Sequence, residues 1–497
     1  MDFIDPKKRR ANKIRLIIGY VLISLAITMT TLMLLYEAYG YGFGKNGQLI
    51  QSGLVFINST PAPANIYLNG VLSSAQTNAR LNLPAGQYTI KLVRNGYRPW
   101  QRAVGVVGGS VERFDYPMLF PIKMLPVAKQ RFTAQPGLFL QSPNRQWLLI
   151  QQPGNDTTFT QYDISNAKQL VQSTVAIPAS IAPANQPGVT WQLVKWSSDN
   201  VHVLIDRIVN GTNDYILFNR QNPAQTIDLT KALNLNNTTQ PDFLNNAYNQ
   251  FYLFDPTSGT LSSASLTSPQ PTTILTNVLA YKQYGSNIIL YATPDKTSPG
   301  QVSVRLKQGA SIYRLNPLTA HAANYLLDLA QYNGNWFIAE GDSSQNKVYV
   351  YENPQSVLSN TPAMPLVPAA ILKINQPNFI AFSANTQFVM AESGTSFAVF
   401  DAQNNKTYAY TSPKPLTGQA HATWMDGDRI DYVSNGAVYV FDYDGANQQT
   451  LQPALNATPI FFDQAYQYSY TLASTIHPLP QAPVSLYQTS MLIPADQ

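Results

Sequence analysis

The stretch LIIGYVLISLAITMTTLMLLY, residues 16–36, sets the frame for interpreting the whole chain. It holds 21 residues and no charged side chain. At about 1.5 Å of rise per residue, a helix of this length crosses a hydrocarbon layer about 30 Å thick. We therefore expect residues 16–36 to form one N-terminal transmembrane helix and the rest of the chain to be exported.

A basic tail precedes this stretch. Residues 1–15 carry six Lys or Arg against two Asp, a net charge of +4, whereas the other 482 residues carry +1. The forty residues that follow the helix hold Lys45 and Glu37 as their charged side chains. This asymmetry predicts a single-pass plasma-membrane protein with a cytoplasmic N-terminus and extracytoplasmic C-terminal domains.

Residues 16–36 allow two other interpretations. Ala38 and Gly40 have the spacing of a signal-peptide cleavage site, but the apolar run exceeds the about 7–15 residues of a signal core. A buried core helix conflicts with the apolar character on all sides and with the basic flank. We prefer an uncleaved anchor, followed over residues 37–50 by a flexible stalk with closely spaced glycines.

Composition narrows the functional classes. The chain has no Cys, which excludes disulfides, thiolate metal sites and thiol nucleophiles. Charged residues are 12% of the chain, so Asn, Gln, Ser, Thr and Tyr must supply polar surface, as suits a protein that meets glycans or other polar polymers. Because most of the positive charge lies in the tail, nucleic-acid binding has no electrostatic support.

Residues 51–121 show short runs with a period of two and no helix signal. We expect strands over 54–57, 65–68, 79–83, 88–94, 100–107 and 110–118, with hairpin turns at Asn69-Gly70 and Asn95-Gly96. About seven short strands in seventy residues predict a small β-sandwich.

This segment resembles the PEGA domain, a module of bacterial and archaeal surface proteins. The resemblance lies in residues 53–57, 59–61, 64–70, 81–88 and 95–97, although Pro-Ala-Pro-Ala stands at 61–64 in place of the namesake tetrapeptide. It implies a non-catalytic extracellular module with no active residues to transfer.

Residues 122–497 repeat a polar turn, an apolar strand, a loop and a second apolar strand. Eight such pairs recur at intervals of roughly 40–50 residues, which is typical of a β-propeller. We prefer eight blades, with seven as the alternative, and expect residues near 129–134 to complete the last blade and close the ring. The cadence resembles the WD40-like or TolB-like propeller class in architecture, without the Trp-Asp dipeptide, and this resemblance specifies no ligand.

A search for chemistry finds no catalytic, cofactor or metal motif. The four histidines, His202, His321, His421 and His477, lie more than 50 residues apart, and we expect them to be independent. The oxygen-rich residues 210–214 are interpreted as a hairpin turn and not as a Ca²⁺ site.

The aspartates and tryptophans also receive structural interpretations. Asp163, Asp255, Asp401 and Asp442 end strands at what we take to be equivalent repeat positions, where each would cap a turn and would not pair for glycoside hydrolysis. We expect core packing for five tryptophans, while some of the 29 tyrosines must face solvent. The five tryptophans are Trp147, Trp191, Trp196, Trp336 and Trp424.

These observations predict a non-catalytic, membrane-anchored binding or scaffolding protein of a bacterial cell surface. Its expected partners are membrane lipid through residues 16–36 and a protein or cell-wall polysaccharide, with no nucleic acid and no cofactor. One alternative is an exported hydrolase with a composite site at the propeller centre. A second is a TolB-like envelope assembly factor.

Overall fold

A computed structural model describes residues 6–38, 40–43, 49–295, 298–360, 366–416, 421–474 and 484–497. The chain divides into two compact units, residues Met1–Ile122 with Ile493–Gln497, and residues Lys123–Leu492.

The apolar stretch near the N-terminus is helical, as predicted. Helix α1 spans Pro6–Ala38, and its segment Asn12–Glu37 has a mean hydropathy of 2.1 in its most apolar part, none of which is buried. Its large apolar side chains are 45–69% exposed. This helix is long and apolar enough to cross a membrane, as an anchor or as a signal sequence.

Within residues 37–50, where we expected a flexible stalk, the structure describes a short strand. Gly40, at φ 79°, turns the chain after α1, and its carbonyl accepts from the Ser52 backbone N–H at 2.7 Å. Strand β1 (Tyr41–Phe43) then pairs antiparallel with the start of β2 (Leu49–Ile57). The glycine spacing suggested flexibility, but residues 41–43 find backbone partners on the edge of β2.

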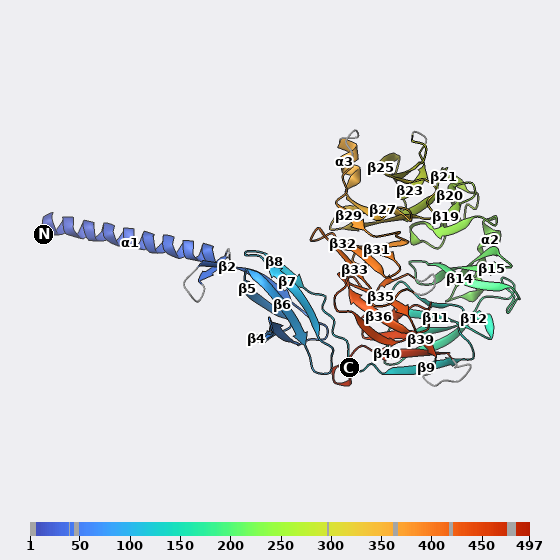
Figure 1. Ribbon diagram of the computed structural model, residues 1–497, viewed down its shortest axis with the longest axis horizontal. Helices are drawn as coiled ribbons and strands as arrows, with labels where there is room; N and C mark the ends of the chain where they lie inside the picture. The colour runs from blue at the N-terminus through green and yellow to red at the C-terminus, as the bar shows by residue number, and fades with distance from the viewer. Residues whose placement is uncertain are drawn as a thin grey trace, which may run out of the picture. The chain divides into compact units, whose positions relative to one another are not determined.

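The rest of the first unit is the predicted β-sandwich (Figure 1). One sheet has the order β1-β2-β5 with β8 on β2, and the other has the order β4-β3-β6-β7. The strands after β2 are β3 (Asn65–Leu68), β4 (Val71–Gln76), β5 (Ala79–Pro84), β6 (Gly86–Val93), β7 (Trp100–Val106) and β8 (Val111–Phe114). The two sheets enclose a core that includes Val55, Ile57, Ile90, Leu92 and Trp100, each at most 1% exposed.

The sequence located most of these strands but missed β4. Asn69 and Gly70, at φ 50° and 83°, form the expected tight hairpin turn between β3 and β4. Strand β4 was missed because it is an edge strand with the exposed residues Val71 and Leu72 and no buried side chain, so it carries no period-two signal.

The second unit is a β-propeller built of four-stranded antiparallel sheets. Within the described residues these sheets number eight, and the choice between eight and seven blades in the whole chain stays a prediction. The first four sheets, in chain order, are β10 (Phe139–Gln141), β11 (Trp147–Gln152), β12 (Asn155–Asp163), β13 (Val171–Ala176); β14 (Val189–Trp196), β15 (His202–Val209), β16 (Thr212–Asn219), β17 (Ile227–Asp228); β18 (Gln240–Phe243), β19 (Gln250–Asp255), β20 (Thr260–Ser265), β21 (Thr272–Leu275); β22 (Ala280–Tyr284), β23 (Ile288–Pro294), β24 (Gln301–Gln308), β25 (Ser311–Thr319).

The remaining sheets follow the same order of strands. They are β26 (Tyr325–Tyr332), β27 (Asn335–Asp342), β28 (Lys347–Glu352), β29 (Ala370–Lys373); β30 (Phe379–Phe382), β31 (Phe388–Ser393), β32 (Ser396–Asp401), β33 (Lys406–Thr411); β34 (Thr423–Trp424), β35 (Arg429–Ser434), β36 (Ala437–Asp442), β37 (Gln449–Pro453); β38 (Phe461–Phe462), β39 (Tyr468–Ser474), β40 (Val484–Ser490) and β9 (Pro126–Phe132). The short helices of the unit are α2 (Leu229–Ala232), α3 (Pro354–Asn360), η1 (Pro223–Gln225) and η2 (Leu244–Asn246).

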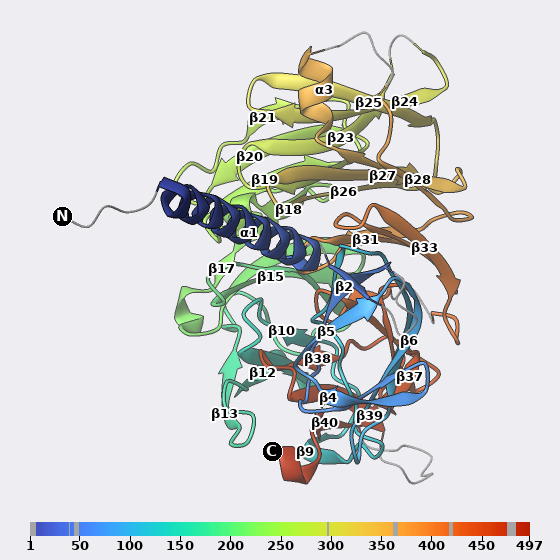
Figure 2. The same cartoon turned by 90° about the vertical axis from the view of Figure 1, so that its left-hand side faces the viewer.

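Apolar cores lie between neighbouring sheets, because each sheet has two faces to bury. Phe159 and Phe218, from the first and second sheets, stack with their ring centroids 5.5 Å apart. The last and first sheets share a core that includes Tyr470, Leu486 and Leu148. Packing of the last sheet on the first shows that the sheets close into a ring (Figure 2).

The ring closes through backbone pairing between the two ends of the unit. Strand β9, from the start of the unit, pairs antiparallel with β40, from its end, with Pro126 opposite Thr489 and Phe132 opposite Val484. The two strands lie side by side in both views (Figure 1, Figure 2). The expectation that a strand near residues 129–134 completes the last sheet is confirmed, with the bounds shifted to 126–132.

The last five residues depart from the sequence-based domain boundary. Ile493–Gln497, expected within the propeller, belong to the first unit and contain the short helix η3 (Pro494–Asp496). Asp496 pairs with the Arg94 guanidinium and accepts from Tyr97 Oη at 2.6 Å. The Ile493 backbone N–H donates to Tyr97 Oη at 3.0 Å. The chain therefore returns to the first unit after the propeller.

Replacing Asp496 with Asn should lower the free energy of detaching this C-terminal segment by about 1 kcal/mol, because Arg94 loses its charged partner. Hydrogen bonds from Arg94 and Tyr97 lower the pKa of Asp496 below its usual value. The stabilisation should therefore be present above about pH 4 and be lost as the pH falls through the lowered pKa. Faster hydrogen exchange at the Ile493 amide measures the change. Asp115→Asn, whose partner is Asn58, is the control, and equal exchange in the two variants would contradict the prediction.

Candidate functional site

The turns that join the first and second strands of the sheets form one face of the propeller, which we call the first-turn face. Four of these turns share one geometry, with a backbone hydrogen bond from the fourth residue to the first and the fourth residue in the left-handed region. The left-handed residues are Arg145, Asn200, Thr386 and Tyr466, at φ 54–61°. These are the polar turns that the sequence indicated before each apolar strand.

Neighbouring turns on this face are tied to each other. The Asn144 backbone N–H donates to Asn200 Oδ1 at 2.9 Å, and Gln464 Nε2 donates to the Asn144 carbonyl at 2.7 Å. Arg145 lies over the Tyr466 ring, 4.5 Å from its centroid, and donates to the Met425 carbonyl at 3.1 Å. These bonds fix the turns of the first, second, seventh and eighth sheets relative to one another.

The first-turn face exposes amides, hydroxyls and two aromatic rings. Tyr248 is 38% exposed and lies flat on the His202 ring, with the centroids 3.9 Å apart. Tyr284 is 40% exposed and meets Trp336 edge-on at 4.8 Å. The turns of the same face also expose uncharged polar side chains: Ser198, Asn245, Asn249, Asn287, Asn333, Asn385 and Gln464. The face therefore offers fixed rings and many uncharged hydrogen-bonding groups.

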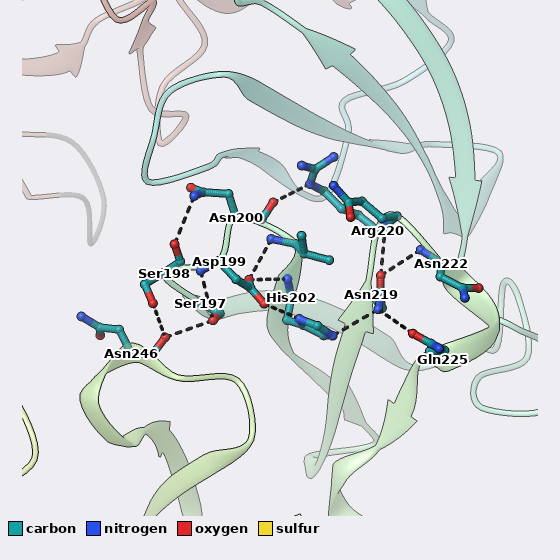
Figure 3. Close-up of polar contacts among 12 residues, drawn as sticks. Ser197, Ser198, Asp199, Asn200, His202, Asn219, Arg220, Asn222, Gln225 and Asn246 are labelled. Carbon is teal, nitrogen blue, oxygen red and sulfur yellow. Dashed lines mark hydrogen bonds and ion pairs between the residues drawn. The ribbon is translucent and has the colours of Figure 1, made fainter.

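His202 connects the turn after β14 to the end of β16 (Figure 3). Its Nδ1 lies 2.6 Å from Asp199 Oδ2, and its Nε2 lies 3.1 Å from Asn219 Nδ2. The Asn219 carbonyl oxygen accepts from the Gln221 and Asn222 backbone, which directs the amide NH₂ towards His202. His202 Nε2 therefore accepts a hydrogen bond from the Asn219 amide, and its Nδ1 donates one to Asp199.

This arrangement leaves His202 without a free nitrogen for general-base catalysis. Burial acts to raise the pKa of Asp199, but bonds from the His202 and Val201 backbone and from the His202 ring outweigh it, and the pKa lies below the usual value. The nearby Ser197 and Ser198 hydroxyls both donate to the Asn246 carbonyl at 3.0 Å. The Ser, His and Asp side chains of this region thus support the turns.

The first strands carry a second set of polar contacts, running from sheet to sheet. Lys195 on β14 pairs with Asp242 on β18 at 3.0 Å, and Gln283 on β22 donates to the same carboxylate at 2.8 Å. Lys282 on β22 pairs with Asp328 on β26 at 3.0 Å. We call these five residues the inner polar chain.

The inner polar chain extends through backbone groups. The second oxygen of Asp328 accepts from the Phe382 backbone N–H on β30 at 3.0 Å, and Trp424 on β34 donates to the Ala381 carbonyl at 3.1 Å. Gln141 on β10 likewise donates to the Phe462 carbonyl on β38 at 2.8 Å. Each carboxylate is thus satisfied by a lysine and a second donor. Asp328 could have been found from the sequence, since a carboxylate within the apolar run 326–329 must have a partner.

A His–Glu pair lies at the other ends of the first strands. Glu392 on β31, 1% exposed, accepts from the Ala422 backbone N–H at 2.7 Å and lies 2.9 Å from His421 Nδ1. His421 stacks on Phe379, with the centroids 4.3 Å apart, and is 37% exposed at its side chain. Burial raises the pKa of Glu392, and the His421 and Ala422 bonds oppose this rise. A buried carboxylate behind a half-exposed imidazole is an arrangement that can support proton transfer.

The histidines do not come together in the part of the chain that is described. His202 and His421 belong to separate clusters, His321 lies in a turn at φ 58°, and His477 is outside the described residues. No group of three His, Asp or Glu in the described ranges is placed to hold a metal ion. Residues Asn210-Gly211 form a hairpin turn between β15 and β16, as predicted.

One expectation about the strand-end aspartates is wrong. Asp163, Asp401 and Asp442 end the third strands of their sheets, whereas Asp255 ends a second strand, at the opposite end of its sheet. The period of the repeat was correct, but a single Asp does not reveal which strand it ends. Asp163, Asp255 and Asp401 do accept backbone N–H bonds in their turns, as expected.

Trp191, Trp196 and Trp336 take part in core packing, as expected. Trp196 is 6% exposed, but the others are only half-buried. Trp147 lies under the Arg220 guanidinium at 3.9 Å, and Trp191 donates to Asp156 at 3.0 Å. The aromatic rings therefore also serve as platforms for polar partners.

Comparisons with known proteins agree with this architecture. The PEGA domain model matches residues 52–118. A search among curated proteins finds no relative of this chain.

Solved structures with a similar chain trace include three of low similarity. Dihydro-heme d1 dehydrogenase NirN in complex with DHE has a TM-score of 0.41 at 14% identity, over 67% of this chain and 68% of that one. Oligogalacturonate lyase in complex with manganese has a TM-score of 0.38 at 9% identity, over 73% of this chain and 99% of that one. Citrobacter koseri AztD has a TM-score of 0.38 at 6% identity, over 74% of this chain and 92% of that one.

At these scores the solved structures carry no argument about activity, and the sheets described above define the fold. The chain thus combines a segment that matches the PEGA domain model with a β-propeller.

Glu340, inside the fifth sheet, offers a test of how the propeller buries a carboxyl group. It is 0% exposed, Tyr351 Oη donates to its Oε1 at 2.8 Å, and its Oε2 has no partner in the described residues. Burial raises the pKa of Glu340 to about 8. The native state therefore holds this proton more tightly than the unfolded state, whose pKa is about 4.3.

Stability should accordingly fall as the pH rises from about 4 to about 8, and Glu340→Gln should remove this slope. The variant should gain about 3 kcal/mol over the wild type at pH 7. Thermal unfolding at several pH values measures the effect. Glu352→Gln, an exposed position on the neighbouring strand, is the control. A wild-type profile parallel to that of Glu340→Gln would contradict the prediction.

Proposed function

We propose that the protein is a membrane-anchored, non-catalytic binding or scaffolding protein of a bacterial cell surface. In this proposal α1 crosses the plasma membrane with its N-terminus in the cytoplasm. The PEGA domain and the propeller lie outside, and the first-turn face binds a cell-wall glycan or a protein.

The main support for the anchor is the unburied apolar surface of α1, for which the described protein supplies no cover. The basic residues before it and the scarcity of charge after it support the orientation.

The observation that carries the binding role is the chemistry of the first-turn face. Tyr248 and Tyr284 are exposed, and each is held by a second ring. Uncharged amides and hydroxyls are exposed in the turns of the same face. The turns of the first, second, seventh and eighth sheets are hydrogen-bonded to each other, and the turn of the second sheet is bonded to that of the third. Rings and donors that are already in place lose little conformational entropy on binding, which suits recognition of a polar polymer.

A hydrolase is the second candidate, favoured by the pair of Glu392 and His421. A reaction at this site would use the imidazole as a general base or acid, with the buried carboxylate orienting it.

The location is tested with the full chain expressed in a bacterial host. Membranes washed at high pH should retain the protein. A C-terminal reporter active only after export should be active, and an N-terminal one inactive. Release of the protein by the wash, or the opposite reporter pattern, would remove the anchor from the proposal.

Binding is tested with detergent-solubilised full-length protein on immobilised cell-wall fractions and glycans. Tyr248→Ala with Tyr284→Ala should weaken binding about tenfold, since each ring contact contributes about 0.5–1.5 kcal/mol. Tyr313→Ala, on the outer strand β25, should leave binding unchanged.

The hydrolase is tested in parallel with a substrate panel. Turnover that is lost in His421→Asn, together with binding indifferent to the tyrosine changes, would replace the binding proposal.

A further inference from the structure

One sheet of the PEGA domain presents a basic and apolar face beside the end of α1. In the register of this sheet, Phe56 on β2 lies opposite Arg80 on β5 and opposite Arg113 on β8. Residues paired in this way point to the same side of a sheet. The Arg113 guanidinium lies over the Phe56 ring, 4.3 Å from its centroid, and both arginines are exposed.

A second row of side chains lies nearer to the helix on the same face. Leu54 is opposite Asn82 on β5 and opposite Val111 on β8, and Val111 is 55% exposed. We call the six residues of the two rows the Arg-Phe-Arg face. The opposite side of the same strands holds Val55, Ile57 and Phe114 in the sandwich core.

The Arg-Phe-Arg face continues directly to the end of the apolar helix. A polar groove joins the two, lined by Glu37 and Gly40 from the helix end and by Ser52, Arg80, Asn82 and Ser110 from the sheet. The arginine row lies four residues along β2 from Ser52, which is about 13 Å, and the Ser52 N–H binds the Gly40 carbonyl. The face is therefore within reach of any lipid headgroups that surround the helix end.

Charge favours one partner for this face. Residues 37–122 carry seven Lys or Arg and three Asp or Glu, whereas the propeller residues 123–492 carry nineteen and twenty-one. Arg94 is paired with Asp496, and Arg102 donates to Tyr116, but Arg80 and Arg113 present their charge outwards. Glu37 is the acidic side chain that lines the groove, so positive charge prevails on the face.

We propose that the Arg-Phe-Arg face rests on the outer surface of the membrane and binds the phosphate groups of anionic phospholipids. Arg80 and Arg113 take the phosphates, while Leu54, Phe56 and Val111 contact the boundary of the acyl chains, as in other interfacial surfaces that combine basic and apolar groups. This inference rests on the proposed crossing of the membrane by α1.

The absence of Cys permits a direct test with a single introduced label. Asn82→Cys in the full chain is labelled with a fluorophore, and the protein is reconstituted into nanodiscs of phosphatidylcholine alone or with about one third phosphatidylglycerol. Quenching by iodide in solution reports whether the face is covered. Flotation of the same nanodiscs shows separately whether α1 has inserted, so a failed anchor is distinguished from a face that binds no lipid.

The label should be protected in the phosphatidylglycerol discs and accessible in the phosphatidylcholine discs. Arg80→Gln and Arg113→Gln should each shift the covered state about fivefold towards the open state, and so should about 1 M salt, which shortens the Debye length to about 3 Å. Lys91→Gln, on the other sheet, should have no effect, and inorganic phosphate should not protect the label. Equal quenching in both lipids, or protection that survives the double arginine change, would overturn the proposal.

Discussion

The pairing of β9 with β40 is the constraint on which the propeller depends. Each four-stranded sheet has two apolar faces, and a row of such sheets has two uncovered faces until its ends meet. The β9–β40 ladder completes the last sheet, and that sheet then shares a core with the first through Tyr470, Leu486 and Leu148. The chain has no disulfide to lock this junction, so backbone hydrogen bonds and apolar burial must hold it. The positions of the first-turn face and of the His421 pair both follow from this closure.

Within the closed ring, polar side chains mostly serve the fold. The carboxylates of Asp242 and Asp328 are each neutralised by a lysine from a neighbouring sheet, and His202 is held by Asp199 and Asn219. Groups bonded in this way have little capacity to move protons, whereas they give rigidity to the turns above them. The exposed rings and amides of the first-turn face therefore stand on a fixed base, which is the property a recognition surface requires. His421 differs, because it is half-exposed in front of a buried carboxylate.

Local signals in the sequence predicted much of the fold. The apolar run, the Asn-Gly turns and the repeated polar turns each act over a few residues, and their consequences are visible without tertiary information. Strand β4 was missed because its side chains are exposed, whereas the other missed elements depend on contacts outside their own residues. Strand β1 is ordered by β2, and η3 is held by Arg94, about 400 residues away. The candidate site was predicted only as a class of surface, since the partners of His202 and Asp328 come from other strands and loops. The buried Asp328 was the one such residue with a visible signal, a charge within an apolar run.

The return of the chain to the PEGA domain has a mechanical consequence. Pro126 and Thr489 are opposite each other, so the chain enters β9 and leaves β40 at the same end of the ladder, and both exits lead into the first unit. A tensile load on a ligand held by the propeller would then pull on both β9 and β40, and in the same direction. If η3 were not held by Arg94 and Tyr97, the load would pass through β9 alone and would shear it from its neighbour. With η3 held in place, the load would be shared by both strands and would not shear β9 from β40.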